Sequence, residues 1–343
     1  MSVSRLDLVR SLFLFVLLYV FYEASDVLWP LLLAFVFSFI LNPLVNFLCH
    51  KVFFERFLLP RAVAVVIVMI AAFTLVGGVM SVIFLPFVDE FNKFMVNLPT
   101  IVDKFHILSL AIGEKANTIE LPSNIRSILD QGMSSVTSFS IDFVKRMAMA
   151  FFSVASRAIA LVVTPVLIYY FLKDGQKMKE DFIQFFSLSH QAKTRAILEE
   201  MALTMSAYLR GQLLISLIMG LMVFCGLFFL KVDYPMVIAL LAFLTETVPI
   251  IGPILGAIPA LALAYLTAPE LAAKVLVFYI IVHQIDNHII VPNIMGHTIA
   301  LHPVIVIMSV IIGGQMFGIV GMMLAVPVAA LLRVFIKHLH IVG

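Results

Sequence analysis

An uncharged apolar run from Ala62 to Val88 constrains the fold of this chain more than any other feature. A run of 18 or more such residues is typical of a transmembrane helix, because about 20 helical residues cross the hydrocarbon core of a bilayer. Comparable runs recur along the chain, of which 63% of residues are hydrophobic and 12% charged. Soluble domains are about 25% charged. The sequence therefore predicts an all-α polytopic membrane protein whose surroundings are the lipid bilayer.

The apolar runs predict six full spans. Residues 1–88 contain three, beginning with a helical hairpin, and residues 147–172 form the fourth. The connection between the second and third spans is short and basic, so the positive-inside rule places it in the cytoplasm. The N-terminus lies two spans earlier and is therefore also expected in the cytoplasm. The C-terminus is expected on the same side. The fifth and sixth spans are expected at residues 211–230 and 272–291.

Two polar segments interrupt these spans. Residues 89–146 combine mixed charges with apolar residues at helical spacing, which predicts two to four amphipathic helices outside the membrane or on its surface. Residues 173–210 begin with several lysines, which favours a cytoplasmic amphipathic segment.

The last third of the chain, residues 211–336, contains an internal repeat. Residues 234–264 match residues 302–332 at an offset of 68, which pairs Pro235 with Pro303 and Pro259 with Pro327. One span separates the two units, so they insert in opposite orientations. Inverted repeats with broken helices are typical of secondary transporters. Residues 211–336 are therefore predicted to form a transport core.

Each repeat unit is too short for two full spans, which need about 20 apolar residues each. Two broken, re-entrant hairpins fit better, although hairpins that cross fully would give eight to ten spans in all. Glycine and proline interrupt helical hydrogen bonding and mark the expected breaks. These residues are Pro249, Gly252, Pro253 and Pro259 in the first unit, Pro292 and Gly296 in the linking segment, and Pro303, Gly313, Gly314, Gly318, Gly321 and Pro327 in the second.

Two carboxylates stand inside this apolar region, Glu246 and Asp286. A carboxylate at membrane depth costs roughly 2.5–3.5 kcal/mol on insertion scales, so each is a functional candidate. Glu246 precedes the first break and is predicted to carry a proton or bind an ion. The alternative is a carboxylate at the start of a helix at the membrane interface, where free amides stabilise it.

Asp286 belongs to a polar cluster with Gln284, Asn287 and His288. We interpret this cluster as a transport or ion-coupling patch. The alternative is the ordinary polar end of a helix at the cytoplasmic face. His283, Asp286 and His288 match no standard metal-ligand spacing, so no metal site is predicted.

Other classes of function lack support. The chain has no HExxH, no GxSxG and no Walker A lysine, which are signatures of metalloproteases, serine hydrolases and P-loop ATPases. The sequence therefore predicts no enzyme and no cofactor. A net charge of +2 with scattered lysine and arginine does not indicate nucleic-acid binding.

Several phrases resemble the autoinducer-2 exporter family of bacterial permease-like transporters over nearly the whole chain. The family has similar sequence at Asn42-Pro43, FLKDG (171–175), YLRGQ (208–212), ETVPIIGPILGAIP (246–259), DNHIIVPNIMG (286–296) and the run from Leu301 to Pro327. The resemblance implies a multi-pass transporter of the bacterial inner membrane that assembles as a homo-oligomer, with a pentamer as one candidate assembly. The family commonly has Glu-Asn-His where this chain has Asp286-Asn287-His288, a shorter carboxylate that could shift ion preference.

Family members are associated with export of autoinducer-2, and others resemble Na⁺ or Li⁺/proton antiporters. The expected substrate is therefore a small molecule or a monovalent cation. Our main hypothesis is a secondary transporter in which Glu246 and Asp286 couple transport to protons or sodium. A passive channel of the same fold is an alternative, and a membrane scaffold that binds partners through residues 89–146 is another. An intramembrane enzyme is the least favoured.

Overall fold

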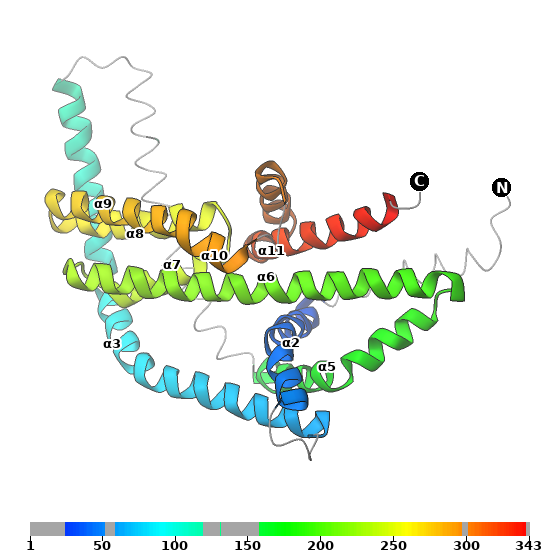
Figure 1. Cartoon of the computed structure of the whole chain (residues 1–343). Coiled ribbons are helices and arrows are strands. Elements are labelled where there is room, and N and C mark those ends of the chain that lie inside the picture. The colour runs from blue at the N-terminus through cyan, green and yellow to red at the C-terminus, as the bar shows by residue number, and fades with distance from the viewer. Residues whose placement is uncertain (1–24, 52–58, 119–130, 132–157, 297–300, 341–343) are drawn as a thin grey trace. The chain divides into compact units, whose positions relative to one another are not determined.

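A computed structural model describes residues 25–51, 59–118, 131, 158–296 and 301–340, and the ordered elements in these ranges are helical (Figure 1). The structure does not describe residues 1–24, which contain the first of the six expected spans. It also leaves out residues 119–130 and 132–157, which include the expected start of the fourth span at residue 147. Within the described ranges, five helices are long and apolar enough to cross a membrane, which confirms an all-α polytopic membrane protein. They are Pro30–Cys49, Arg61–Ile101, Leu188–Phe229, Pro269–Met295 and Pro303–His338.

The helices run past several of the expected segment boundaries. Helix α3 (Arg61–Thr118) continues through residue 88 and through Pro99. Helices α5 (Ala158–Gln184) and α6 (Leu188–Phe229) likewise continue through residues 172 and 210. The change from apolar to polar residues alters where a helix meets solvent, but it does not remove backbone hydrogen bonds, so it is a weak signal for a helix end.

Two compact units divide the chain, and the first combines Met1–Phe73 with Val154–Ala192. Its described core joins helix α2 (Ser25–Lys51), the start of α3 and α5 through small and branched side chains such as Ala34, Val65 and Ile168. Arg61 links the three helices. Its Nε donates to the carbonyl oxygen of Leu172 at 2.7 Å, and its guanidinium also donates to Asn46 Oδ1 at 3.2 Å and Asn42 Oδ1 at 3.0 Å.

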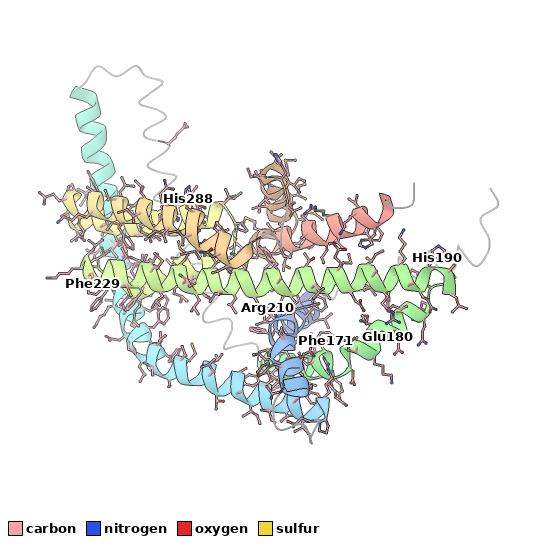
Figure 2. All side chains as sticks on the ribbon, viewed as in Figure 1. Phe171, Glu180, His190, Arg210, Phe229 and His288 are labelled. Carbon is pink, nitrogen blue, oxygen red and sulfur yellow. The ribbon has the colours of Figure 1, made fainter. Side chains whose placement is uncertain are left out.

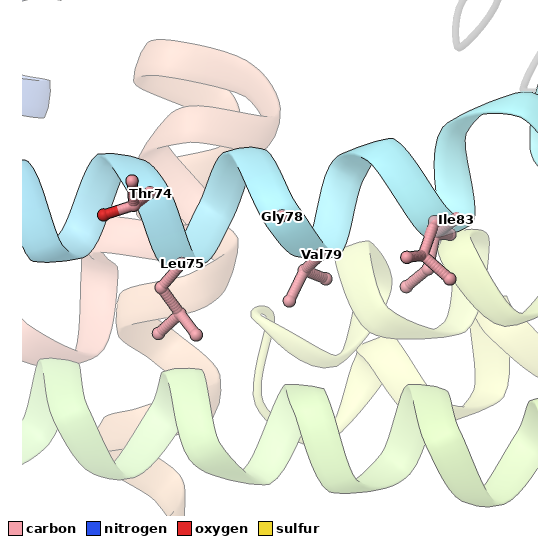
Figure 3. A pocket seen from close by; sticks show the side chains of 6 residues that line it. Thr74, Leu75, Gly78, Val79 and Ile83 are labelled. Carbon is pink, nitrogen blue, oxygen red and sulfur yellow. The ribbon is translucent and has the colours of Figure 1, made fainter.

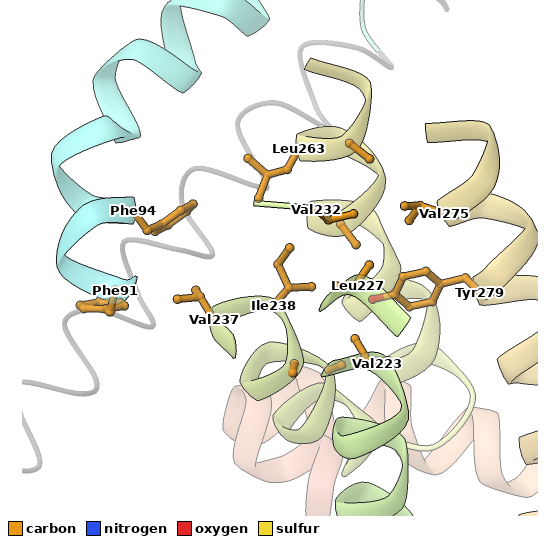
Figure 4. Packing of buried hydrophobic residues seen from close by; sticks show 14 of the residues in the cluster. Phe91, Phe94, Val223, Leu227, Val232, Val237, Ile238, Leu263, Val275 and Tyr279 are labelled. Atoms are coloured by element: carbon orange, nitrogen blue, oxygen red, sulfur yellow. The ribbon is translucent and has the colours of Figure 1, made fainter. Parts of the chain in front are cut away.

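The second unit combines Thr74–Ser153 with Lys193–Gly343 and contains the candidate transport region. Its described helices beyond α3 and α6 are α7 (Pro235–Glu246), α8 (Ile251–Thr267), α9 (Pro269–Ile285), a π-helical turn η1 (Asp286–Ile290), α10 (Val291–Met295) and α11 (Pro303–His340). One hydrophobic core joins α3, α6, α7, α8 and α9. Figure 4 shows Phe91 and Phe94 of α3 on one side of this core and Tyr279 of α9 on the other.

The chain reverses between α7 and α8. Ile250 in the turn has a φ of 71°, which a branched side chain adopts only under strain. Gly252 follows, and a Cβ on this residue would overlap the carbonyl group of Thr245. The absence of a side chain at Gly252 is therefore what lets the two short helices approach.

Helix α11 also bends back on itself. Its backbone leaves helical geometry at Phe317 and at Gly318, whose φ is 60°. A Cβ on Gly321 would overlap the carbonyl group of Gly313, although eight residues of straight helix span about 12 Å. Close contact between these two glycines requires a reversal between them, so α11 consists of two arms joined at Phe317 and Gly318.

One segment of α3 packs against little of the described chain. Its apolar side chains, such as Leu75, Val82 and Leu85, are largely exposed. A shallow, almost wholly apolar groove of about 450 Å³ lies along Thr74, Leu75, Gly78, Val79, Val82 and Ile83 (Figure 3). Such a surface is expected of a helix that faces lipid.

Candidate transport site

Glu246 is the last residue of α7, and its side chain is only 6% exposed. Pro249 has no N–H to continue the helix, and the turn that follows has the positive φ at Ile250. The structure thus places Glu246 at the end of a helix rather than at a helix start. Free carbonyl groups and the negative end of the helix dipole gather there. The alternative interpretation, in which free amides stabilise this carboxylate, is therefore wrong about its position.

Asp286 is 3% exposed and begins the π-helical turn η1. The turn closes through a hydrogen bond from the Val291 N–H to the Asp286 carbonyl. Pro292 lacks the N–H that an α-helix would use next, which favours the wider turn. The chain nevertheless stays helical to Met295. A π-helical turn inside an α-helix is rare and is often found at functional sites.

The fold brings the two predicted carboxyl groups together. Asp286 lies close enough to Glu246 for their charges to repel. Within the described residues, neither carboxyl group forms an ion pair with lysine, arginine or histidine. Two like charges in a medium of low polarity repel strongly. A proton or a small cation bound to either group would lessen that repulsion.

Successive turns of α9 and η1 face the α7–α8 hairpin. The Tyr279 hydroxyl donates to the Gly256 carbonyl at 3.4 Å. The His283 ring interacts with the backbone of Pro253, and Asp286 follows within electrostatic range of Glu246. One face of the α9–η1 helix therefore presents a hydroxyl, an imidazole and a carboxyl group to the first hairpin.

The other members of the predicted polar cluster point elsewhere. Gln284, Asn287 and His288 are exposed on the single chain. The His288 Nδ1 lies 3.0 Å from the Gln284 carbonyl oxygen of its own helix (His288 is labelled in Figure 2). The structure does not bring these three side chains to the pair formed by Glu246 and Asp286.

The predicted glycines and prolines lie at turns and close contacts. In the first hairpin, Pro249 is in the turn, Pro253 is in the first turn of α8 and Pro259 is buried within α8. Gly296, with a φ of 51°, follows α10. Pro303 begins α11 and Pro327 is buried in its second arm. Between them, Gly314 contacts Met322 across the bend, and a Cβ on Gly314 would lie 3.0 Å from the Met322 Cγ.

Three residues of α6 belong to this region, although the sequence indicated them only as part of the YLRGQ phrase. Gln212 Nε2 donates to the Glu246 carbonyl oxygen at 2.7 Å. Gly211 packs so closely on Met295 that an added Cβ would lie 2.8 Å from its Sδ. Tyr208 is buried in a cluster with Val248 of the first turn and with residues of both arms of α11. A glutamine and a glycine inside an apolar helix are the signal that could have identified them.

Known proteins are similar to this chain over most of its length. The family described as AI-2E family transporter matches residues 12–341. The AI-2 transport protein TqsA of Escherichia coli (strain K12) is 27% identical over 324 residues, which cover 92% of this chain and 87% of that protein. "Putative transport protein YhhT" of the same strain is 29% identical, with coverage of 92% and 86%. "Putative transport protein YueF" of Bacillus subtilis (strain 168) is 24% identical, with coverage of 92% and 85%.

Proposed function

The chain belongs to the AI-2E family of membrane transporters, and on this premise we propose that Glu246 and Asp286 couple the transport of a small solute to protons or to Na⁺ or Li⁺. The observation that carries the proposal is the pair of buried carboxyl groups, which lie within repulsive range of each other. Intramembrane carboxylates commonly mark ion pathways and proton relays. The family is one of transporters and not of enzymes, as the sequence predicts.

The proposed architecture is an inverted repeat of two re-entrant hairpins, each broken at mid-membrane. Helix α7 has 12 residues, about 18 Å of helix, which is shorter than the roughly 30 Å hydrocarbon core. The two reversals lie at equivalent positions of the repeat, because Ile250 and Gly318 differ by the same offset of 68 and both have positive φ. Pro235 and Pro303 likewise begin the first arm of each hairpin.

In this proposal, a proton or cation neutralises the carboxyl pair and lets the hairpins close around the site. Release of the ion restores the repulsion and favours the other arrangement. Direct contact supports coupling between the two hairpins, since Val248 of the first turn packs with Val310 and Val326 of α11. An ion can shift such an equilibrium only by its difference in affinity for the two arrangements. The carboxyl pair supplies that difference.

The proposed cargo is a small molecule such as autoinducer-2, or a monovalent cation exchanged for protons. The name of TqsA, an AI-2 transport protein, supports the first of these. The proposed location is the bacterial inner membrane with both termini in the cytoplasm. We also propose a homo-oligomer. A Cβ added at Gly77 or Gly78 would meet no other part of the described chain within 4 Å, so these glycines leave room for close approach of a second copy.

Purified protein in liposomes with an imposed pH gradient tests the coupling role. We expect Na⁺-, Li⁺- or solute-dependent proton flux that Glu246→Gln and Asp286→Asn each abolish. Glu270→Gln is the matched control, because Glu270 is an exposed carboxylate in the first turn of α9. Wild-type flux in the Glu246→Gln variant would refute the coupling role. Flux that continues without any ion gradient and never concentrates solute would instead indicate a passive channel.

A further inference from the structure

Four buried side-chain atoms make no hydrogen bond within the described part of the chain, and all four lie near the α7–α8 hairpin. They are Tyr208 OH, Ser216 Oγ, His283 Nε2 and Asp286 Oδ1. Tyr208 is 3% and Ser216 0% exposed. Buried polar atoms nearly always have a partner, and an exception calls for an explanation such as a water molecule or a ligand.

Ser216 differs from other serines in the helices of this chain. Ser38 and Ser309 each donate to the carbonyl oxygen four residues earlier, at 2.6 and 2.7 Å, which is how a helical serine usually satisfies its hydroxyl. Ser216 forms no such bond, although its surroundings exclude bulk water in the single chain. Its hydroxyl is therefore available to a molecule between the helices.

Tyr208, Gln212, Ser216 and Gly220 recur at four-residue spacing, so they form one face of α6. This face points at the first hairpin. Tyr208 packs with Val248 in the turn, Gln212 binds the Glu246 carbonyl, and Gly220 lies against Phe243 of α7.

The same part of α6 also packs on the helix that contains Asp286. Ile215 and Met219, on either side of Ser216 in sequence, share a hydrophobic cluster with Val282 and Ile290. Val282 and Ile290 lie four residues before and four residues after Asp286. The segments that contain the unpaired Ser216 hydroxyl and the unpaired Asp286 oxygen therefore pack against each other.

We propose that the Tyr208–Ser216 face of α6 is the hydrogen-bonding wall of an aqueous path to Glu246 and Asp286, and that its two hydroxyl groups bind neutral hydroxyl-bearing molecules. A hydroxyl group both donates and accepts, so it suits water and neutral hydroxylated solutes. The two positions are eight residues apart, about 12 Å along the helix, which is too far for both to hold one monatomic ion. They are successive binding positions along a path.

Cysteine accessibility tests this wall without any measurement of transport. In protein lacking Cys49 and Cys225, Ser216→Cys is exposed in liposomes to a charged methanethiosulfonate reagent that reaches thiols only through water. The matched control is Val223→Cys, which is on the same helix and equally buried at 0% exposure, but in the hydrophobic core that joins α3, α6, α7, α8 and α9. We expect Ser216→Cys to react at least about tenfold faster, because a thiol sealed in apolar packing is inert. Tyr208→Cys probes the other end of the wall in the same way.

The same reaction identifies what occupies the path. If erythritol slows modification of Ser216→Cys but not of Ser189→Cys, at an exposed position in the polar first turn of α6, a hydroxylated solute binds at the wall. If Ser216→Cys reacts fast and erythritol does not slow the reaction, water alone occupies the path. That result still supports the Tyr208–Ser216 face as its hydrogen-bonding wall. A Ser216→Cys variant that is folded and monodisperse, yet reacts no faster than Val223→Cys, would overturn the proposal. Loss of proton coupling in Glu246→Gln bears on the carboxyl pair alone, so the two proposals fail separately.

Discussion

Gln212 donates a hydrogen bond of 2.7 Å from its side-chain Nε2 to the backbone carbonyl of Glu246. The bond ties α6 to the end of α7, where the helix has no further N–H of its own to offer. Gln212 therefore holds the backbone that positions the Glu246 carboxyl group, while no hydrogen bond joins the Gln212 side chain to that carboxyl group in the described structure.

Replacement of Gln212 by methionine keeps the length of the side chain and removes the donor. An intramolecular hydrogen bond contributes about 1 kcal/mol, so we expect ion-dependent proton flux to fall about fivefold while the protein remains folded. Flux in proteoliposomes and thermal unfolding in detergent are the measurements. Leu213→Met is the control, because Leu213 is 43% exposed on the next position of the same helix. Equal flux in both variants would show that the bond has no positioning role.

The contact between Gly313 and Gly321 predicts a steric effect. Alanine at Gly321 would place a methyl group on the Gly313 carbonyl, and overpacking of this kind costs typically 1–3 kcal/mol. We expect Gly321→Ala to lower the thermal unfolding temperature in detergent. Gly77→Ala is the control, since a Cβ added at Gly77 would meet no other part of the described chain within 4 Å. There, alanine should be neutral or stabilising, because it suits a helix better than glycine does.

The sequence revealed the carboxyl pair because a charge in apolar sequence is conspicuous, and Glu246 and Asp286 do lie together. Being adjacent in sequence to Asp286 does not put a side chain on its face. Successive residues of a helix lie about 100° apart around the axis, so Gln284, Asn287 and His288 project to other sides and are exposed, whereas Tyr279 and His283 share the face of Asp286. The glycine-rich middle of the second repeat unit did indicate where the chain reverses, at Phe317 and Gly318.

Other features escaped the sequence because their signals are weak. A single hydroxyl or amide in an apolar helix, such as Ser216 or Gln212, raises little penalty in a hydropathy pattern and does not stand out as Glu246 does. The expected boundary at residue 88 marks a change in polarity, whereas the helix continues to Thr118. Hydropathy describes the medium around a helix, and backbone hydrogen bonding determines where it ends.

Glu90 of α3 acts as the cap of helix α7, so its replacement should destabilise the first hairpin. Its carboxylate accepts a hydrogen bond of 2.9 Å from the Val237 N–H at the start of α7, where Tyr234 at the N-cap provides no side-chain cap of its own. Loss of a cap costs about 0.5–2 kcal/mol. We expect Glu90→Ala to lower the unfolding temperature, and Glu90→Gln, which keeps an acceptor oxygen, to restore most of it.

The adjacent residue provides the control for this cap. Asp89 pairs with Lys93 at 2.6 Å across an exposed helix surface, and water and salt screen such pairs so that they contribute little to stability. Asp89→Asn should therefore change the unfolding temperature much less than Glu90→Ala. If the two variants unfold at the same temperature, the Glu90 side chain does not act as the cap of α7.

The hydrogen bonds of Arg61 predict that another positively charged side chain at this position will not stabilise the first unit equally well. The guanidinium donates to Leu172, Asn46 and Asn42 at once, and a lysine ammonium cannot reproduce that planar fork. We expect Arg61→Lys to lower the unfolding temperature by an amount equivalent to about 1–3 kcal/mol, because carbonyl acceptors then lose their partner. Arg333→Lys, at an exposed position of α11, should leave it unchanged. An Arg61→Lys variant as stable as the Arg333→Lys control would mean that these hydrogen bonds add nothing beyond the positive charge.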